Sequence, residues 1–247
     1  MRTLSWKNAE PIAAFFRQIH NKKKRKGGPI VEKRKNLPAR LCACLLTLLL
    51  LAFTPAAGAD SIYPKALTAQ EYQTLNLFLS NFTEVGVGEI SPFSPDQVLV
   101  DFAHDHLWCN RHDDFEFGEY FDGYNCRVAD TDIQSVIDDY FYDAPQVDLS
   151  QTRLTYRDGY YYHQETGGWS SGGFALSASA CALGDGKWLV SFLVFGAGEF
   201  WDNNELGLSF AEAIDKYGAP CNQGAAVIYA SDLADRSTYK MVSYTLV

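Results

Sequence analysis

The sequence lacks the short motifs that identify the commonest enzyme chemistries. It has no phosphate-binding loop, no dinucleotide-binding glycine fingerprint and no HExxH zinc motif. No CxxC pair is present, which argues against a thiolate zinc site. The acidic residues also miss the spacing of an EF-hand calcium loop. The sequence therefore names no specific reaction.

Long hydrophobic runs are also scarce. The longest covers residues 41–53, whereas a helix needs about 20 apolar residues to cross the roughly 30 Å of hydrocarbon in a bilayer. A basic stretch precedes this run and Ala57-Gly58-Ala59 follows it, so we expect a signal peptide cleaved before Asp60. An uncleaved anchor is the alternative, and the positive flank stays cytoplasmic in both cases. The basic part is long, and a start near Val31 would give a leader of ordinary length.

Basic residues are rare after residue 59. Residues 1–59 contain 12 of the 21 Lys and Arg with two acidic residues, whereas residues 60–247 contain 9 basic and 28 acidic residues, a net charge of −19. Such a charge repels phosphate, so we expect no nucleic-acid partner. Residues 1–59 are thus interpreted as a basic leader and residues 60–247 as one domain, large enough to bury a core.

Four cysteines remain after the leader. An even number outside the cytosol permits two disulfides in three possible pairings. The pairs Cys109–Cys126 and Cys181–Cys221 are favoured because each closes a modest loop, and buried thiols are the alternative.

Helix signals come first along the domain. Thr68 opens a capping box before "EYQTLNLFLSNF", Ser94 with Pro95 opens a second helix, and Thr131 opens a third that Pro145 stops. A short helix over residues 209–218 has a serine cap and a closing glycine.

Strand signals follow residue 150. Hairpins are predicted around Asp158-Gly159, around Asp185-Gly186 and around "DLADRS" near the end of the chain. The sequence therefore predicts an α+β fold: three N-terminal helices packed on a curved antiparallel sheet of about six strands, with one short helix before the last hairpin.

Short aromatic patches carry a resemblance. "LNLFLSNFTEVG", "FAHDH", "IDDYF" and "YKMVSYTLV" resemble an uncharacterised domain of exported or membrane-anchored proteins of gut Gram-positive bacteria, across most of residues 72–247. The resemblance implies export and a location at the cell envelope, and it implies no catalytic residue.

The segment "HDHLWCNRHDD" contains three of the five histidines. On one helix His104 and His106 point in different directions, so they cannot chelate one ion. We expect His106 to lie in the core or line a pocket, and His104 to lie on the flank beside Asp101 and Trp108.

An acidic loop follows that helix. Asp113, Asp114 and Glu116 are weak candidates for a calcium site, and a solvated acidic loop is the favoured interpretation. No other cofactor is predicted.

Two further features have alternative interpretations. "GWSSG" (residues 168–172) matches a nucleophile elbow, but no histidine follows it and a strand rather than a helix comes next, so a loop is favoured. The many Tyr, Phe and Trp rings are expected mostly in the core, and exposed ones could stack on sugars or bind a peptide.

The sequence favours a secreted or cell-surface domain that binds an envelope ligand (a glycan, peptide or protein) without catalysis, and meets the membrane only through an uncleaved leader. The alternative is a hydrolase or isomerase with His106 or His163 as base and an acidic partner such as Asp101. A purely assembly role is the third hypothesis, and it requires a large apolar patch. Enzymatic activity is left open.

Overall fold

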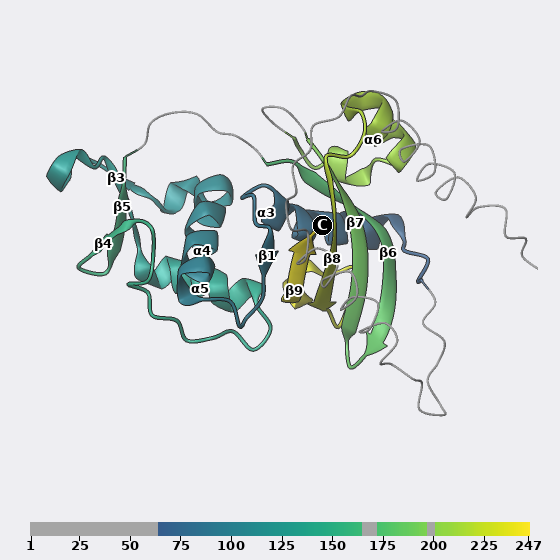
Figure 1. Ribbon diagram of the computed structural model, residues 1–247, viewed down its shortest axis with the longest axis horizontal. Helices are drawn as coiled ribbons and strands as arrows, with labels where there is room; N and C mark the ends of the chain where they lie inside the picture. The colour runs from purple at the N-terminus through teal and green to yellow at the C-terminus, as the bar shows by residue number, and fades with distance from the viewer. Residues whose placement is uncertain (1–63, 165–171, 197–200) are drawn as a thin grey trace, which may run out of the picture. The chain divides into compact units, whose positions relative to one another are not determined.

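The computed structural model of the chain describes residues 64–164, 172–196 and 201–247. All of them belong to one compact unit, Asp60–Val247. The leader, the "GWSSG" serines and Trp169 lie outside the described residues. In the described part the α-helices are α3 (Ala69–Thr83), α4 (Asp96–Asn110), α5 (Asp130–Tyr140) and α6 (Phe210–Tyr217) (Figure 1). None of them is long and apolar enough to cross a membrane.

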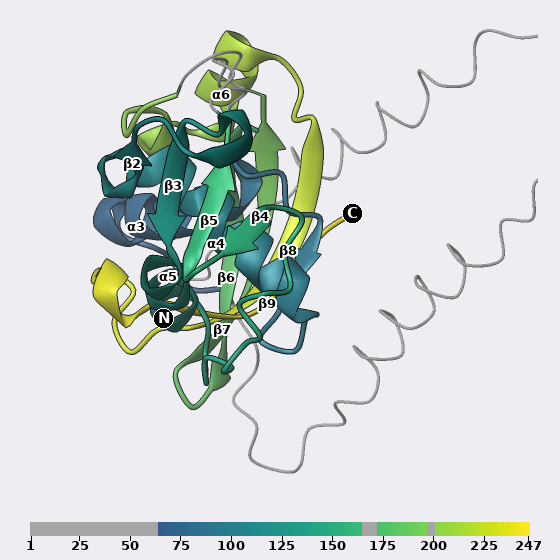
Figure 2. The same cartoon turned by 90° about the vertical axis from the view of Figure 1, so that its left-hand side faces the viewer.

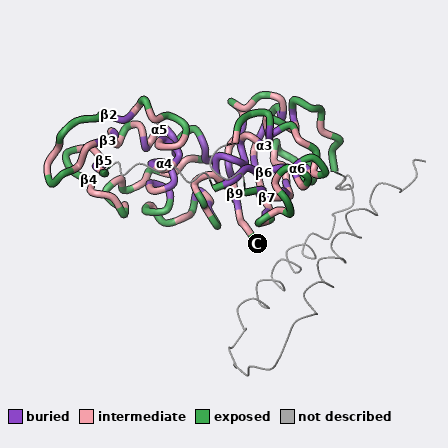
Figure 3. The backbone as a smooth tube through the Cα atoms, turned by 90° about the horizontal axis from the view of Figure 1, so that it is seen from above, coloured by how far each residue is buried: buried purple, intermediate pink, exposed green. Residues whose placement is uncertain are grey.

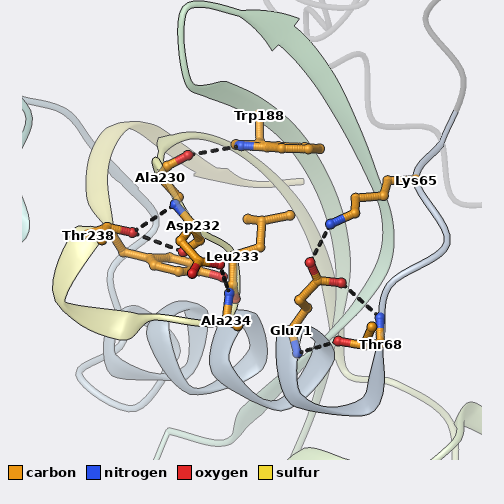
Figure 4. Close-up of polar contacts among 10 residues, drawn as sticks. Lys65, Thr68, Glu71, Trp188, Ala230, Asp232, Leu233, Ala234 and Thr238 are labelled. Carbon is orange, nitrogen blue, oxygen red and sulfur yellow. Dashed lines mark hydrogen bonds and ion pairs between the residues drawn. The ribbon is translucent and has the colours of Figure 1, made fainter.

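The capping box predicted at Thr68 and the serine cap predicted at Ser209 are both present. Thr68 Oγ1 accepts a hydrogen bond from Glu71 N (3.2 Å) while the Glu71 side chain accepts one from Thr68 N (2.9 Å). Lys65 adds an ion pair to the Glu71 carboxylate, as Figure 4 shows. Ser209 and Glu212 repeat this arrangement at α6, which Gly218 terminates at φ 81°. These two helices are thus fixed by local hydrogen bonds.

The starts of α4 and α5 differ from the predictions. Pro95 rather than Ser94 stands at the cap position of α4, and the Ser94 hydroxyl instead accepts from Ser91 N (2.9 Å) in the preceding turn. Helix α5 begins at Asp130, without a side-chain cap. A serine or threonine near a helix start can satisfy a turn as well as a cap, so the sequence places these boundaries only to within a residue or two.

The strands form two antiparallel sheets. The five-stranded sheet has the order β1-β9-β8-β7-β6 and the four-stranded sheet the order β2-β3-β5-β4. The strands of the first are β1 (Glu89–Ile90), β6 (Phe174–Gly184), β7 (Lys187–Phe195), β8 (Asn222–Tyr229) and β9 (Lys240–Leu246). Those of the second are β2 (Glu116–Phe117), β3 (Cys126–Ala129), β4 (Thr155–Arg157) and β5 (Tyr160–His163). Figure 2 shows the four-stranded sheet nearest the viewer.

The predicted single curved sheet of about six strands is therefore wrong. The three hairpins exist, with Asp158 and Asp185 at φ 54° and 51° in their turns. However, the hairpin of β4 and β5 pairs with β3 rather than with the strands that follow it. Strands β1, β2 and β3, of two to four residues, are too short for alternation to reveal them.

Helices α4 and α5 lie between the two sheets (Figure 1). One cluster of buried side chains joins them to both sheets, including Val128 of β3, Ile137 of α5 and Met241 of β9. The buried segments in Figure 3 accordingly gather on the helices and the strands beside them. Because a second sheet covers α4, this helix buries two faces instead of one.

Helix α3 lies along the edge of β6, where its polar side chains bond to the strand. Asn76 Oδ1 accepts from Ser177 N (2.7 Å), Ser80 Oγ accepts from Ala175 N (2.9 Å) and Thr83 Oγ1 donates to Gly173 O (2.8 Å). The open edge of a sheet offers unpaired backbone groups to other chains. Here α3 satisfies them with side chains.

Neither predicted disulfide is present among the described cysteines. Cys181 lies opposite Leu189 on β7, whereas Cys221 N donates to Val194 O (2.9 Å), five residues further along that strand. Five strand residues span about 17 Å, and disulfide-bonded Cα atoms lie within about 7 Å. Cys109 is not bonded to Cys126 either.

Candidate functional site

A cavity of about 510 Å³ lies among α3, α4, α5 and the segment from η4 (Arg236–Thr238) to β9. The described residues that line it come from segments far apart in the sequence: Leu77 and Asn81; His106, Asn110 and Arg111; Val136, Asp139 and Tyr140; and Arg236, Ser237 and Lys240. This volume lies within the range of about 300–1,000 Å³ typical of small-molecule sites. The mixture of rings, amides and cations identifies it as the candidate site.

His106 reaches this cavity from the middle of α4. It is 4% exposed. Its ring is tilted against that of Tyr140, with 4.5 Å between centroids, and is stacked with that of Phe102 at 6.0 Å. Burial lowers its pKa to about 3, helped by the positive charges of Arg236 and Arg111. The imidazole is therefore neutral over the physiological pH range. The sequence left a core position and a pocket-lining position open, and His106 is both buried and part of the cavity lining.

A carboxylate stands beside His106, but it is not Asp101. Glu84 Oε1 lies 4.0 Å from His106 Nδ1, and Asn110 donates to Glu84 Oε1 while its Nδ2 lies 3.1 Å from His106 Nδ1. Burial raises the pKa of Glu84 to about 7, although the hydrogen bond from Asn110 opposes this shift. Asp101 instead accepts from Thr152 Oγ1 (2.8 Å) and Arg153 N (3.2 Å).

His104 occupies a separate environment and is buried, contrary to the prediction that it lies on an open flank. It is 4% exposed, with its ring centroid 5.3 Å from that of His163 and 5.6 Å from that of Phe115. Its Nδ1 lies 3.2 Å from Asp105 Oδ1, and Arg153 pairs with the same carboxylate. The four-stranded sheet, which the single-sheet prediction omitted, covers this side of α4. His104 and His106 diverge as expected.

His163 packs at the end of β5 against a tryptophan ring and a thiol. Its ring centroid lies 4.3 Å from that of Trp108, and both ring nitrogens lie 3.4 Å from Cys126 Sγ. Partial burial and the neighbouring His104 lower the pKa of His163 to about 4. This cluster of rings joins α4 to the four-stranded sheet.

The acidic loop does not gather its carboxylates. Asp114 forms an ion pair with Arg111 (2.6 Å), and Glu116 accepts from Arg127 Nε (2.8 Å). Asp113 is exposed on the short helix η1 (His112–Asp114). Within residues 64–164, 172–196 and 201–247, no three His, Cys, Asp or Glu side chains are grouped so as to hold a metal ion. The calcium candidates are thus not brought together.

Part of the aromatic content lies on the outer face of the four-stranded sheet. Arg127 lies 3.9 Å from the ring centroid of Tyr160 and 4.9 Å from that of Tyr120. Phe121 covers Tyr162 at 4.7 Å between centroids. The largest fully buried side chains are also rings, and they lie in the core: Tyr161, Tyr239 and Tyr244 are at most 1% exposed.

Most residues of the candidate site were absent from the sequence predictions, among them Glu84, Asn110, Arg236 and Lys240. Glu84 and Asn110 end their helices, and Arg236 and Lys240 stand in the final hairpin, more than 120 positions from Asn110. No spacing rule connects these positions, because only the contacts of α4 and α5 with the end of the chain bring them together. The hydrophilic segment "DLADRSTYK" was the one available signal, and it resembles an ordinary turn.

Comparison of the chain with protein-family models, with curated proteins and with solved structures finds no match.

Proposed function

We propose that residues 60–247 form an exported, non-catalytic domain that binds a small ligand at the cell envelope, in the cavity beside His106. The observation that carries this proposal is the cavity itself, about 510 Å³ and lined by apolar, amide and cationic side chains from four segments. Export and an envelope location rest on the leader and on the resemblance of the aromatic patches.

Acid–base catalysis is the second candidate, favoured by the 4.0 Å between His106 Nδ1 and Glu84 Oε1. Two observations favour ligand binding over catalysis. A histidine with a pKa of about 3 is a weak base at neutral pH, and efficient general bases have pKa values near the working pH. Glu84 has a suitable pKa of about 7, but it does not line the cavity. Among the described lining residues, Asp139 is the one carboxylate.

The neutral fluorescent amine N-phenyl-1-naphthylamine tests whether the cavity admits a ligand. Titration into the purified full chain is expected to give saturable binding. Ser237→Trp places a ring at the cavity lining and is expected to weaken binding at least about tenfold. The exposed Ser231 lies in the same connection but not in the lining, so Ser231→Trp is the matched control. Equal binding by the two variants would show that the probe does not use the cavity, and the proposal would fail.

The catalytic alternative has its own test. Glu84→Gln keeps an acceptor for Asn110 and removes the titrating group, so an acid–base enzyme would lose turnover of model esters or glycosides at least about a hundredfold. A binding domain shows no turnover that this substitution changes.

A further inference from the structure

The charges around the cavity are opposite in sign to those of the domain as a whole. Residues 60–247 carry a net charge of −19, yet three cations line the cavity beside a single described carboxylate, that of Asp139. The cations are Arg111, Arg236 and Lys240. A local reversal of sign on an acidic surface focuses anions at that point.

The Arg236 guanidinium packs against two rings and has no carboxylate partner among the described residues. Its guanidinium carbon lies 4.5 Å from the ring centroid of Phe78 and 4.6 Å from that of Tyr140. None of the ion pairs among the described residues involves Arg236. The side chain also hydrogen-bonds to Tyr140. A guanidinium has five N–H donors in a planar fork, so others remain to match a carboxylate or phosphate.

Lys240 stands where α5 ends. Its Nζ donates to the backbone oxygens of Asp138 (2.6 Å) and Asp139 (3.0 Å), which accounts for two of its three donors. It too has no carboxylate partner among the described residues, whereas Arg111 is paired with Asp114 at 2.6 Å. Two of the three cations at the cavity therefore lack a counter-ion within the described part of the protein.

We propose that the ligand of this cavity is a small organic anion, whose carboxylate or phosphate binds Arg236 and Lys240 and whose apolar body lies on Leu77, Val136 and Tyr140. This inference rests on the proposed function, because it specifies the ligand class of the same cavity. The competing explanation is that Arg236 only fills space between Phe78 and Tyr140, and the test separates the two.

Two fluorescent probes that differ by one charged group give the test. 8-Anilinonaphthalene-1-sulfonate carries a sulfonate that N-phenyl-1-naphthylamine lacks. With the full chain, the double substitution Arg236→Gln, Lys240→Gln is expected to raise the dissociation constant of the anionic probe at least about tenfold and to change that of the neutral probe less than about twofold. The matched control is Arg157→Gln, Lys187→Gln, which removes the same charge from outside the cavity lining and is expected to leave both constants unchanged.

A substitution that tightens binding of the anionic probe cannot be explained by misfolding of the variant. Asp139→Asn removes the one described carboxylate from the lining and is expected to tighten binding of the anionic probe about twofold or more at low salt. Asp138→Asn has the same charge change at the neighbouring position, which does not line the cavity, and is expected to have a smaller effect.

The outcomes distinguish the two proposals. If neither probe binds in a way that Ser237→Trp abolishes, the proposed function fails. If the neutral probe binds there but the anionic probe responds equally to the cavity and control substitutions, the cavity stands and the anionic ligand is refuted.

Discussion

Asn110 connects two side chains whose pKa values burial moves in opposite directions. The same loss of water raises the pKa of Glu84 to about 7 and lowers that of His106 to about 3, because burial penalises the charged form of each. A proton on the carboxyl and a neutral imidazole is the pairing that avoids both penalties. Because such pKa shifts make the free energy of unfolding depend on pH, they can be measured.

Glu84→Gln is expected to stabilise the protein at pH 8 and not at pH 4. The native pKa of about 7 exceeds the ordinary value of 4.5, so the native state binds more protons between these values and its stability falls as pH rises through them. The substitution removes this loss of stability, which is at most about 3 kcal/mol at pH 8. Urea denaturation at both pH values gives the difference. The exposed Glu89→Gln is the control, and a pH-independent difference would contradict the prediction.

Cys221 and Cys109 are expected to differ in their reactivity towards thiol reagents. Cys221 is exposed, whereas burial, with the charges of Glu84 and Asp105, raises the pKa of the Cys109 thiol to about 12. Since the thiolate is the reactive form, Ellman's reagent at pH 8 is expected to label Cys221 rapidly and Cys109 only after unfolding. Cys221→Ser is expected to remove one equivalent from the rapid phase. A rapid phase that this substitution leaves unchanged would contradict the exposure of Cys221.

Helix α3 has a polar face that is buried, which is unusual for an amphipathic helix. Asn76 is 0% exposed and bonds to two different segments, accepting from Ser177 N (2.7 Å) and donating to Leu206 O (2.8 Å). Leu206 belongs to the second buried cluster, which connects β6 to α6. One amide therefore ties α3 both to the sheet edge and to the short helix η3 (Glu205–Gly207).

Asn76→Leu is expected to destabilise the fold by about 2–4 kcal/mol, because it leaves a buried N–H and a buried C=O without partners. Thr74→Leu, two positions away on the same helix, is the control and is expected to change stability by less than about 1 kcal/mol. The free energy of unfolding from urea titration measures both. If the two substitutions lowered the free energy of unfolding equally, the hydrogen bonds of Asn76 would not contribute to stability.

The elements that were predicted correctly are those with a local cause. The capping box at Thr68, the serine cap at Ser209, and the Asp-Gly turns at Asp158 and Asp185 act within four residues, so the sequence shows them directly. Strand pairing acts at a distance. The pairing of Ile90 with Tyr244 leaves no periodic trace in a strand of two residues, and the four-stranded sheet went unrecognised for the same reason.

The candidate site was predictable only in part, for a related reason. His106 was expected in the core or at a pocket because it shares the apolar stripe of its helix, and that was correct. His104 was placed on an open flank because the sheet that covers it had not been predicted. The partners Glu84, Arg236 and Lys240 depend on how helices and hairpins meet, which no helical or strand period encodes.

The whole chain combines a leader of net charge +10 with a region of net charge −19. If the leader is a cleaved signal, intact mass of the protein from the culture medium is expected to match a chain beginning at Asp60. Replacing Ala57 and Ala59 by bulky residues should then retain the uncut chain in the membrane fraction. A secreted protein that keeps residues 1–59, or a wild-type chain found only in membranes, would contradict cleavage.

Strand β9 follows every other described helix and strand in the sequence, and yet it pairs with the first of the described strands. It pairs with β8 and with β1, and it carries Lys240 of the cavity. Contacts between residues about 155 positions apart close slowly, because the loop between them must be ordered before the pairing offsets the lost entropy. Until β9 has been synthesised, therefore, β1 lacks this partner and the cavity lacks part of its wall. The synthesis of β9 sets the earliest moment at which the polypeptide can complete this cavity.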